Sequence, residues 1–160
     1  MNRILLLIGV VLVVGCGPPP DGPFEEYHEN GQLEGKGTFK DGELDGPYEE
    51  YYENGQLTEK GTYKDGERDG PFEWYHENGQ LMSRGTFSNG ETDGPYENYH
   101  GNGQLMSKGT RKDGKLDGPF ESYHENGQLW EKSSFKDGEL CGEWFEEGET
   151  VTYDPCPPGN

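Results

Sequence analysis

The feature that most constrains the fold of this chain is an internal repeat with a constant period of 24 residues. Glycine, proline and an aromatic residue recur together five times, followed by one variant, at Gly22-Pro23-Phe24, Gly46-Pro47-Tyr48, Gly70-Pro71-Phe72, Gly94-Pro95-Tyr96, Gly118-Pro119-Phe120 and Gly142-Glu143-Trp144. Five copies are complete and a sixth is partial, so the array occupies residues 22–148. A fixed period without insertions predicts copies that stack on their neighbours, and it opposes a single globular domain.

Each copy contains two turn signals. The first is Asn-Gly, at residues 30–31, 54–55, 78–79, 102–103 and 126–127, and the second is Asp-Gly or Asn-Gly, at residues 41–42, 65–66, 89–90, 113–114 and 137–138. Both dipeptides favour type I′ turns, because they tolerate positive φ at both central residues. We therefore predict an all-β fold with two antiparallel strands per repeat, in which an elongated hairpin meander has roughly a dozen strands.

Large side chains recur at fixed places in the copies and define the expected core. The columns are Phe24/Tyr48/Phe72/Tyr96/Phe120/Trp144, Tyr27/Tyr51/Tyr75/Tyr99/Tyr123, Phe39/Tyr63/Phe87/Phe135 and Leu33/Leu57/Leu81/Leu105/Leu129. One copy has too few of these side chains to fold alone, so stability must come from contact between neighbours. We expect an aromatic ring of the next strand to cover each glycine inside the second strand, at Gly37, Gly61, Gly85 and Gly109.

The N-terminal segment predicts export and lipidation. Arg3 precedes an apolar run that is much shorter than the about 20 residues needed to span a membrane, so residues 1–15 are interpreted as a cleaved signal peptide. Val13-Val14-Gly15-Cys16 resembles the bacterial lipobox, which implies that Cys16 carries acyl chains. The alternative is a soluble secreted protein whose cleavage site ends at a cysteine.

Residues 16–21 would then be the lipidated cysteine and a short proline-rich tether. We expect attachment to the lipid bilayer of the cell envelope through the acyl chains, which anchor a protein stably when two or more are present. Gly17, rather than an aspartate, follows the cysteine, and this favours the outer membrane or an outward-facing surface.

Charge restricts the partners of the mature chain. Removing the signal peptide takes away Arg3 alone, which leaves 12 basic against 32 acidic side chains and a net charge of −20. Nucleic acid and anionic lipid surfaces are therefore poor partners. We attribute the acidity to the solubility of a thin, exposed protein, and we expect a monomer.

Two cysteines remain once Cys16 is lipidated. Cys141 stands in the last repeat and Cys156 in the C-terminal tail, residues 149–160. An oxidising compartment favours a disulfide between them, which would clamp the end of the array. Metal binding or thiol chemistry by the pair is the alternative.

The repeat resembles a known family. Tyr51-Tyr52-Glu53-Asn54-Gly55-Gln56-Leu57, followed by Lys60-Gly61-Thr62-Tyr63-Lys64-Asp65-Gly66, is similar to the MORN repeat variant, a family that also includes chains catalogued as toxin–antitoxin antitoxin components. The resemblance covers nearly the whole mature chain. It implies a β-hairpin array used for attachment or scaffolding, and it supplies no catalytic residues.

Three recurrent clusters suggest chemistry, but each is better explained by structure. Equivalent histidines, at His28, His76, His100 and His124, would lie about 10 Å apart, too far to share one zinc ion. Asp41-Gly42-Glu43-Leu44-Asp45-Gly46 resembles the start of a calcium-binding EF-hand loop but lacks the glutamate at the twelfth position. The glutamates Glu25, Glu49, Glu73, Glu97 and Glu121 are equivalent, whereas a catalytic carboxylate pair needs unequal environments. We expect no metal, no cofactor and no enzymatic activity.

The positions that vary between copies are candidates for partner recognition. Trp74 belongs to the variable column Glu26/Glu50/Trp74/Asn98/Ser122, whereas Met82, Met106 and Trp130 belong to the column Glu34/Thr58/Met82/Met106/Trp130. We expect these four side chains to form a partner surface, unless they only add packing to the array. The sequence thus predicts a protein-interaction scaffold of the cell envelope. The alternatives are a glycan-binding or wall-binding module and an antitoxin-like neutraliser of an exported toxin.

Overall fold

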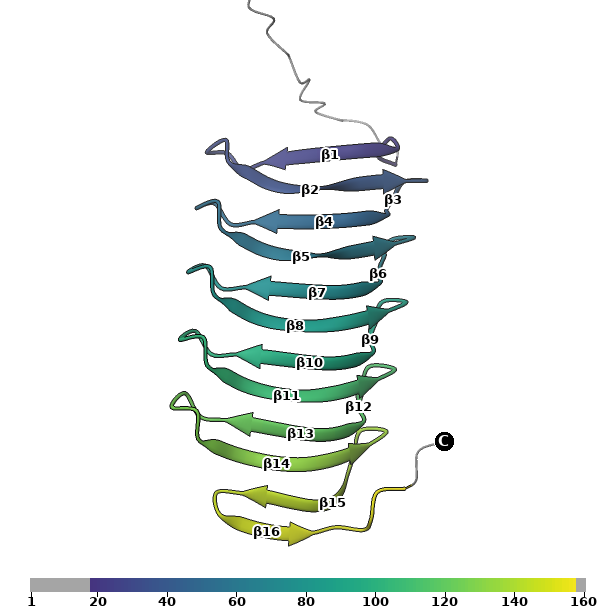
Figure 1. The fold of residues 1–160 in the computed structure, drawn as a ribbon. Helices are drawn as coiled ribbons and strands as arrows, with labels where there is room; N and C mark the ends of the chain where they lie inside the picture. The colour runs from purple at the N-terminus through teal and green to yellow at the C-terminus, as the bar shows by residue number, and fades with distance from the viewer. Residues whose placement is uncertain (1–17, 158–160) are drawn as a thin grey trace, which may run out of the picture.

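The computed structural model describes residues 18–157, and these residues form one open antiparallel sheet (Figure 1). The twelve strands of the main path each pair with the next in chain order: β1 (Gly22–Tyr27), β2 (Leu33–Lys40), β4 (Gly46–Tyr51), β5 (Leu57–Lys64), β7 (Gly70–Tyr75), β8 (Leu81–Ser88), β10 (Gly94–Tyr99), β11 (Leu105–Lys112), β13 (Gly118–Tyr123), β14 (Leu129–Lys136), β15 (Glu139–Glu146) and β16 (Glu149–Thr152). Four two-residue strands pair beside this path: β3 (Glu43–Leu44), β6 (Glu67–Arg68), β9 (Glu91–Thr92) and β12 (Lys115–Leu116). The predicted all-β hairpin meander is confirmed.

The Asp-Gly turns have the predicted geometry. In the first copy, Asp41 has φ of 53° and Gly42 has φ of 85°, which is the positive pair that a type I′ turn requires. The turn joins β2 to β3. Asp45 then donates its N–H to the carbonyl oxygen of Thr38 at 2.9 Å, before the chain continues into β4.

The Asn-Gly loops form hairpins as predicted, but the predicted turn type is wrong. Gly31 has φ of 83°, whereas Asn30 is not among the residues with positive φ. The N–H of Gly31 donates to the carbonyl of His28 at 2.8 Å, and Asn30 Oδ1 accepts the N–H of Gln32 at 2.9 Å. These bonds define a three-residue loop that ends in a left-handed glycine, the geometry that accompanies a bulge in the flanking strands. The register indeed shifts between Glu26 and Tyr27.

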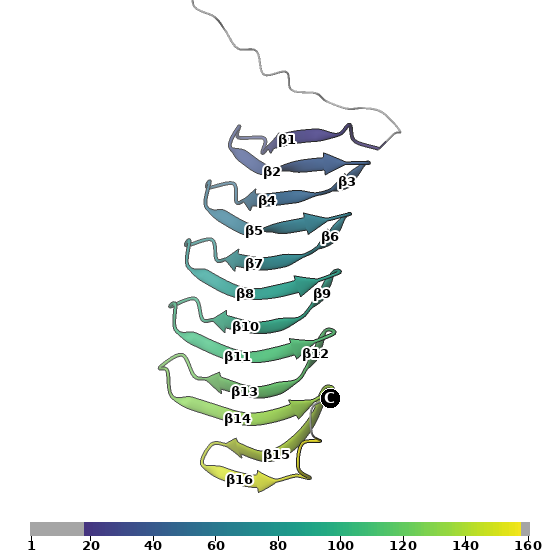
Figure 2. The ribbon, with the colours of Figure 1, turned by 45° about the vertical axis from the view of Figure 1, so that its right-hand side comes forward.

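The Asn-Gly loops follow one long side of the sheet and the Asp-Gly turns the other (Figure 1). Among the described residues, no second layer covers either face, as the turned view also shows (Figure 2). Because successive side chains of a strand point to opposite faces, each repeat contributes residues to two distinct surfaces. We call them the aromatic face, which carries the columns that begin at Phe24 and Phe39, and the ionic face, which carries the column that begins at Glu25.

The core lies on the aromatic face. Rings of the two columns pack together within and between copies, with centroid separations of 5.3 Å for Tyr48 and Tyr63 and 5.5 Å for Tyr63 and Phe72. Phe72 is 1% exposed, and no other aromatic side chain of the described residues is buried as completely. The array therefore has its tightest packing near its middle.

Rings cover Gly37, Gly61 and Gly109 of the second strands, as expected, whereas Gly85 lies against the Cβ atom of Tyr96. A Cβ atom at Gly61 would overlap the ring of Phe72, which comes from the next long strand. At Gly109, however, the covering ring is that of Tyr96 from the preceding strand, because Tyr96 is the direct cross-strand partner of that glycine. The rings therefore come from either side of the glycine, and the prediction of the next strand alone was too narrow.

The C-terminal end departs from the repeat. Strand β15 is continuous, and the turn at Glu147 and Gly148, with φ of 46° and 92°, leads into β16 within the segment expected to be a tail. A disulfide joins Cys141 to Cys156, the two cysteines that the sequence pairs. Cys141 occupies the position held by an aspartate in the preceding copies, so the last repeat is modified to hold the tail.

Candidate interaction surfaces

A row of alternating charges crosses the ionic face. Glutamates and basic residues stand directly opposite one another on successive strands, in the order Glu25, Lys36, Glu49, Lys60, Glu73, Arg84, Glu97, Lys108, Glu121 and Lys132. Ion pairs join neighbouring copies, for example Lys36 to Glu49 at 2.7 Å and Lys60 to Glu73 at 2.8 Å. Opposite charges at facing positions stabilise a sheet and fix its register.

Tyrosines strengthen this row. In each complete copy, the hydroxyl of the tyrosine in the column from Tyr27 to Tyr123 donates to the glutamate two residues earlier. Hydrogen bonds from Lys108 and then Tyr123 and Lys132 lower the pKa of Glu121 to about 2, and the bond to Glu121 raises the pKa of Tyr123. Contacts within the array likewise lower the pKa values of Glu49, Glu73 and Glu97 in the same column.

Met82, Met106 and Trp130 form an exposed apolar column near the starts of β8, β11 and β14. Met82 is the extra residue of β8 at a register shift, between Ser83 and Leu81, which pair with Trp74 and Tyr75. The three apolar side chains are 38%, 40% and 41% exposed and occupy the same position in successive repeats. Trp130 also lies beside His124, with ring centroids 5.9 Å apart. We refer to these three residues as the Met/Trp column.

Trp74, which the sequence groups with that column, lies on the aromatic face. Its ring stacks on Phe72 at 5.6 Å and meets Phe87 edge-on at 5.8 Å. Its indole N–H donates to Glu59. Trp74 is therefore a packing residue that joins two copies.

An ion pair within the aromatic face is the feature that sequence reasoning missed. Glu59 is 6% exposed, and Arg68 Nη2 lies 3.0 Å from its Oε2. The guanidinium carbon lies over Phe72, Trp74 and Phe87, at 5.2, 5.4 and 5.6 Å from the ring centroids. Glu59 and Arg68 belong to the second copy and the three rings to the third, so this cluster fastens two repeats together.

The sequence could have predicted this ion pair, because both of its residues differ from those at the same positions in neighbouring copies. Glu59 stands where the first and third copies have Gly35 and Ser83, and Arg68 stands where the first copy has Leu44. Two opposite charges that appear together in one copy, where the adjacent copies have no charged residue, indicate a buried pair, because a buried charge needs a partner.

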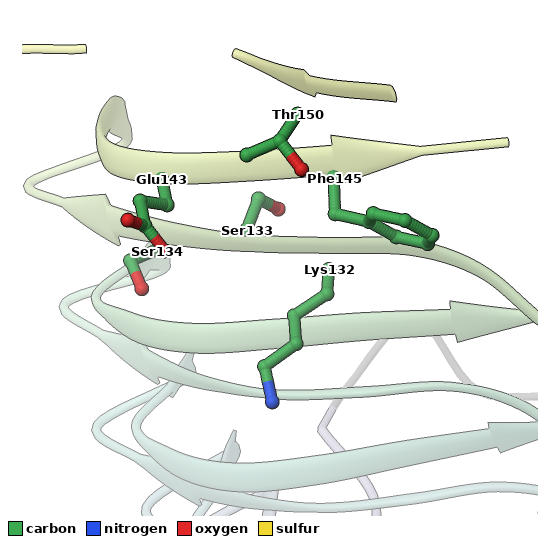
Figure 3. A pocket seen from close by; sticks show the side chains of 6 residues that line it. All are labelled: Lys132, Ser133, Ser134, Glu143, Phe145 and Thr150. Atoms are coloured by element: carbon green, nitrogen blue, oxygen red, sulfur yellow. The ribbon is translucent and has the colours of Figure 1, made fainter. Parts of the chain in front are cut away.

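A hollow of about 360 Å³ lies at the C-terminal end of the sheet (Figure 3). Strands β14, β15 and β16 line it with Lys132, Ser133, Ser134, Glu143, Phe145 and Thr150. Phe145 occupies the place that a glutamate holds in every complete copy, so the row of alternating charges ends at Lys132. The sheet therefore has different chemistry at its two ends.

The histidines and acidic turns have structural positions. His28 Nε2 lies 2.8 Å from the carbonyl oxygen of Tyr51 in the next copy, and His100 Nε2 lies 2.9 Å from that of Tyr123. Within residues 18–157, no group of three or more His, Cys, Asp or Glu side chains is placed to hold a metal ion. The same stretch contains no helix long and apolar enough to cross a membrane. Cys16 and the signal peptide lie outside the described residues.

Fold and surfaces together define an antiparallel β-hairpin repeat protein with two chemically distinct faces. The family described as the MORN repeat variant matches five tandem segments, at residues 20–41, 44–65, 68–89, 92–113 and 116–137. The chain belongs to this family, and the predicted resemblance is confirmed. MORN repeats indicate a repeat-based protein-interaction or binding module, and such all-β repeats are typically non-catalytic.

Comparison with curated proteins gives no match. Among solved structures, the chain is similar to one described as the crystal structure of TarM, with 9% sequence identity and a TM-score of 0.30. The similarity covers 72% of this chain but only 20% of that one. A TM-score of this size supports no conclusion about function.

Proposed function

We propose that this chain is a lipid-anchored scaffold of the cell envelope that binds a partner protein through the Met/Trp column. The observation that supports this most directly is the exposure of Met82, Met106 and Trp130, at 38%, 40% and 41%, in one column of three successive repeats. Exposed apolar side chains that line up in this way are typical of interaction sites. Methionine suits such a surface because its flexible, polarizable side chain adapts to a partner.

The first two copies provide a natural contrast. At the position of Met82 they carry Glu34 and Thr58. The scaffold is the same in these copies, so polarity at this position does not harm the fold. The apolar residues of the later copies therefore serve something other than the hairpin itself.

A capture experiment tests the partner surface. The chain from Gly17 onward, immobilised, would be exposed to envelope extract with and without prior protease treatment of the extract. We expect capture of one discrete protein that protease treatment abolishes and that a Met82→Ser/Met106→Ser/Trp130→Ser variant loses. A Glu34→Ser/Thr58→Ser variant, altered in the same column, is the matched control and should retain the partner.

Other outcomes would change the assignment. Capture that survives protease but disappears after glycan digestion would replace the protein scaffold by a wall-binding module. Equal capture by the triple variant and the control would show that the Met/Trp column is not the binding surface. Circular dichroism of each variant establishes that the fold is intact.

Membrane anchoring is tested separately. The proposal expects labelled palmitate to be incorporated into the full-length protein at Cys16, and a Cys16→Ser variant to lose both the label and membrane association. The lipobox-like sequence before Cys16 supports this part of the proposal. Membrane association that persists in the unlabelled variant would contradict lipid anchoring.

A further inference from the structure

Four junctions between neighbouring copies of the array have the same form. The outer edge of β1 is equivalent to one side of such a junction, and no strand of the described residues forms the other side. Strands β4, β7, β10 and β13 each pair with the preceding copy, whereas β1 pairs only with β2 among the described residues (Figure 1). An edge strand offers unpaired backbone groups to another extended chain. The internal junctions show which side chains such a chain would need.

Each internal junction combines the same three contacts. In the first, Lys36 pairs with Glu49 at 2.7 Å, His28 reaches the carbonyl of Tyr51 at 2.8 Å, and Asn30 Nδ2 donates to the carbonyl of Glu53 at 2.8 Å. The ladder itself is short, because only Gly35 and Lys36 pair with β4. Side chains from one segment, residues 28–36, therefore supply much of the specificity.

The later junctions repeat this arrangement with small changes. Tyr52 replaces the histidine in the second junction and donates to the carbonyl of Tyr75 at 2.8 Å, and Arg84 replaces the lysine in the third, where it pairs with Glu97 at 2.5 Å. The asparagine contact is present in all four. A basic residue and a pair of hydrogen-bond donors at fixed spacing are thus the common requirement.

The β1 edge presents the acceptors of this junction without its donors. Glu25, Tyr27 and Glu29 occupy the positions of Glu49, Tyr51 and Glu53 in the next copy. Within residues 18–157, no basic side chain pairs with Glu25, and no side chain donates to the carbonyls of Tyr27 or Glu29.

Exposure reflects the missing partner. Tyr27 is 50% exposed, whereas Tyr51 is only partly exposed and lies under Lys36 of the preceding copy, with the ammonium 5.9 Å from the ring centroid. Glu25 and Glu26 are exposed, whereas Glu49 and Glu50 are half-buried. The open part of the edge is therefore Glu25 to Glu29.

The tether contacts the first copy at its Asp-Gly turn. Pro18 lies against Gly42, as the side chain of Glu43 lies against Gly66 in the next copy. The tether thus takes the place of a preceding copy beside the Asp-Gly turn. Among residues 18–157, no strand pairs with the part of this β1 edge that lies toward the Asn-Gly loop.

We propose that the edge of β1 from Glu25 to Glu29 binds an extended, basic segment of a partner protein by strand addition. The segment places lysine or arginine opposite Glu25 and supplies side-chain donors to the carbonyls of Tyr27 and Glu29. Charge favours this occupant over a second copy, because two β1 strands side by side would bring Glu25 and Glu26 of both chains together, and like charges at facing positions destabilise a sheet. This edge is separate from the Met/Trp column, so each site can fail independently of the other.

A peptide titration tests the proposal. The probe is a synthetic peptide with the sequence of residues 28–40, which carries His28, Asn30 and Lys36, added to the isotope-labelled chain from Gly17 onward. We expect amide shifts in the NMR spectrum, and slowed hydrogen exchange, confined to the region of Glu25 to Glu29. A Glu25→Lys variant should bind the peptide at least about tenfold more weakly. A peptide in which glutamate replaces Lys36 should bind this variant as tightly as the original peptide binds the unaltered chain.

Controls separate this proposal from the alternatives. A Glu149→Lys variant makes the same charge change on the opposite edge strand, β16, and should bind the peptide normally, as should the triple variant of the Met/Trp column. Absence of localised shifts at millimolar peptide, or undiminished binding by Glu25→Lys, would overturn the proposal. Sedimentation that shows a dimer of the chain alone, abolished by Glu25→Lys, would assign the edge to a second copy instead.

Discussion

Phe72 is the side chain whose removal should damage the array most. Its ring is 1% exposed and lies within 5.6 Å, between centroids, of the rings of Tyr63, Trp74 and Phe87. It also covers Gly61 of the preceding strand. A Phe72→Ala substitution therefore removes apolar burial, three ring contacts and the cover of a glycine at one point.

The expected loss follows from this environment. Truncation of a buried phenylalanine to alanine costs about 3–5 kcal/mol, and the size depends on how well the site can collapse. A single-layer sheet has no second layer that could move in, so we expect about 4 kcal/mol. For a domain of this size such a change lowers the melting temperature by roughly 10 °C.

Phe24→Ala is the matched control, since it makes the same substitution in the same column at the end of the array. Phe24 is half-buried and has one ring partner, Phe39, at 4.6 Å. We expect it to cost about 1–2 kcal/mol, less than half of the loss at Phe72. Urea denaturation followed by circular dichroism measures both. Equal losses, or a loss below about 1 kcal/mol at Phe72, would refute the idea that the copies are held together by stacked rings.

Three further predictions concern the rest of the array. The pKa of Glu121 is lowered from 4.5 to about 2, so the stability it contributes is complete above its ordinary pKa and disappears as the pH falls through that interval; melting temperatures in acid should fall less steeply for Glu121→Gln. The disulfide between Cys141 and Cys156 closes a separation of 15 residues, and reduction should cost up to about 3 kcal/mol in denaturant titrations, an effect absent from the double serine variant. Gly61→Ala should destabilise by about 1–3 kcal/mol because the new Cβ meets the Phe72 ring, whereas Gly85→Ala, which meets Tyr96 Cβ at 3.4 Å, should be nearly neutral; similar midpoints would contradict the difference in space.

The period alone was sufficient to predict the meander, because hairpin turns at fixed spacing leave little choice of strand order. Turn chemistry was less informative. Asn30-Gly31 and Asp41-Gly42 look alike in sequence, yet only the second is a type I′ turn. The first becomes a longer loop in which its asparagine side chain accepts the N–H of Gln32. The loop at Asn126-Gly127 has the same backbone bonds, although its asparagine bonds to no other copy among the described residues, so the dipeptide alone does not determine the turn type.

The sequence also did not show which residues share a face of the sheet. Trp74 and Met82 both vary between copies and both are large, so they were assigned to one surface. Trp74 pairs with Ser83 and packs on the aromatic face, whereas Met82 is the extra residue at the bulge in β8 and pairs with no residue of β7. Counting along the chain without this bulge cannot tell which face a residue joins.

The two ends of the sheet differ in whether they retain the residues that pair with a neighbouring copy. At the C-terminal end, Cys141 replaces an aspartate, Phe145 replaces a glutamate, and β16 with the disulfide holds the tail beside the last copy. At the β1 end, Glu25 and Tyr27 retain the residues that receive a preceding copy inside the array. If a terminal repeat had no function other than to end the sheet, both ends could have lost these residues, since an exposed strand edge invites unwanted pairing. Their retention at one end, beside loss at the other, is what an edge kept for a basic partner segment requires.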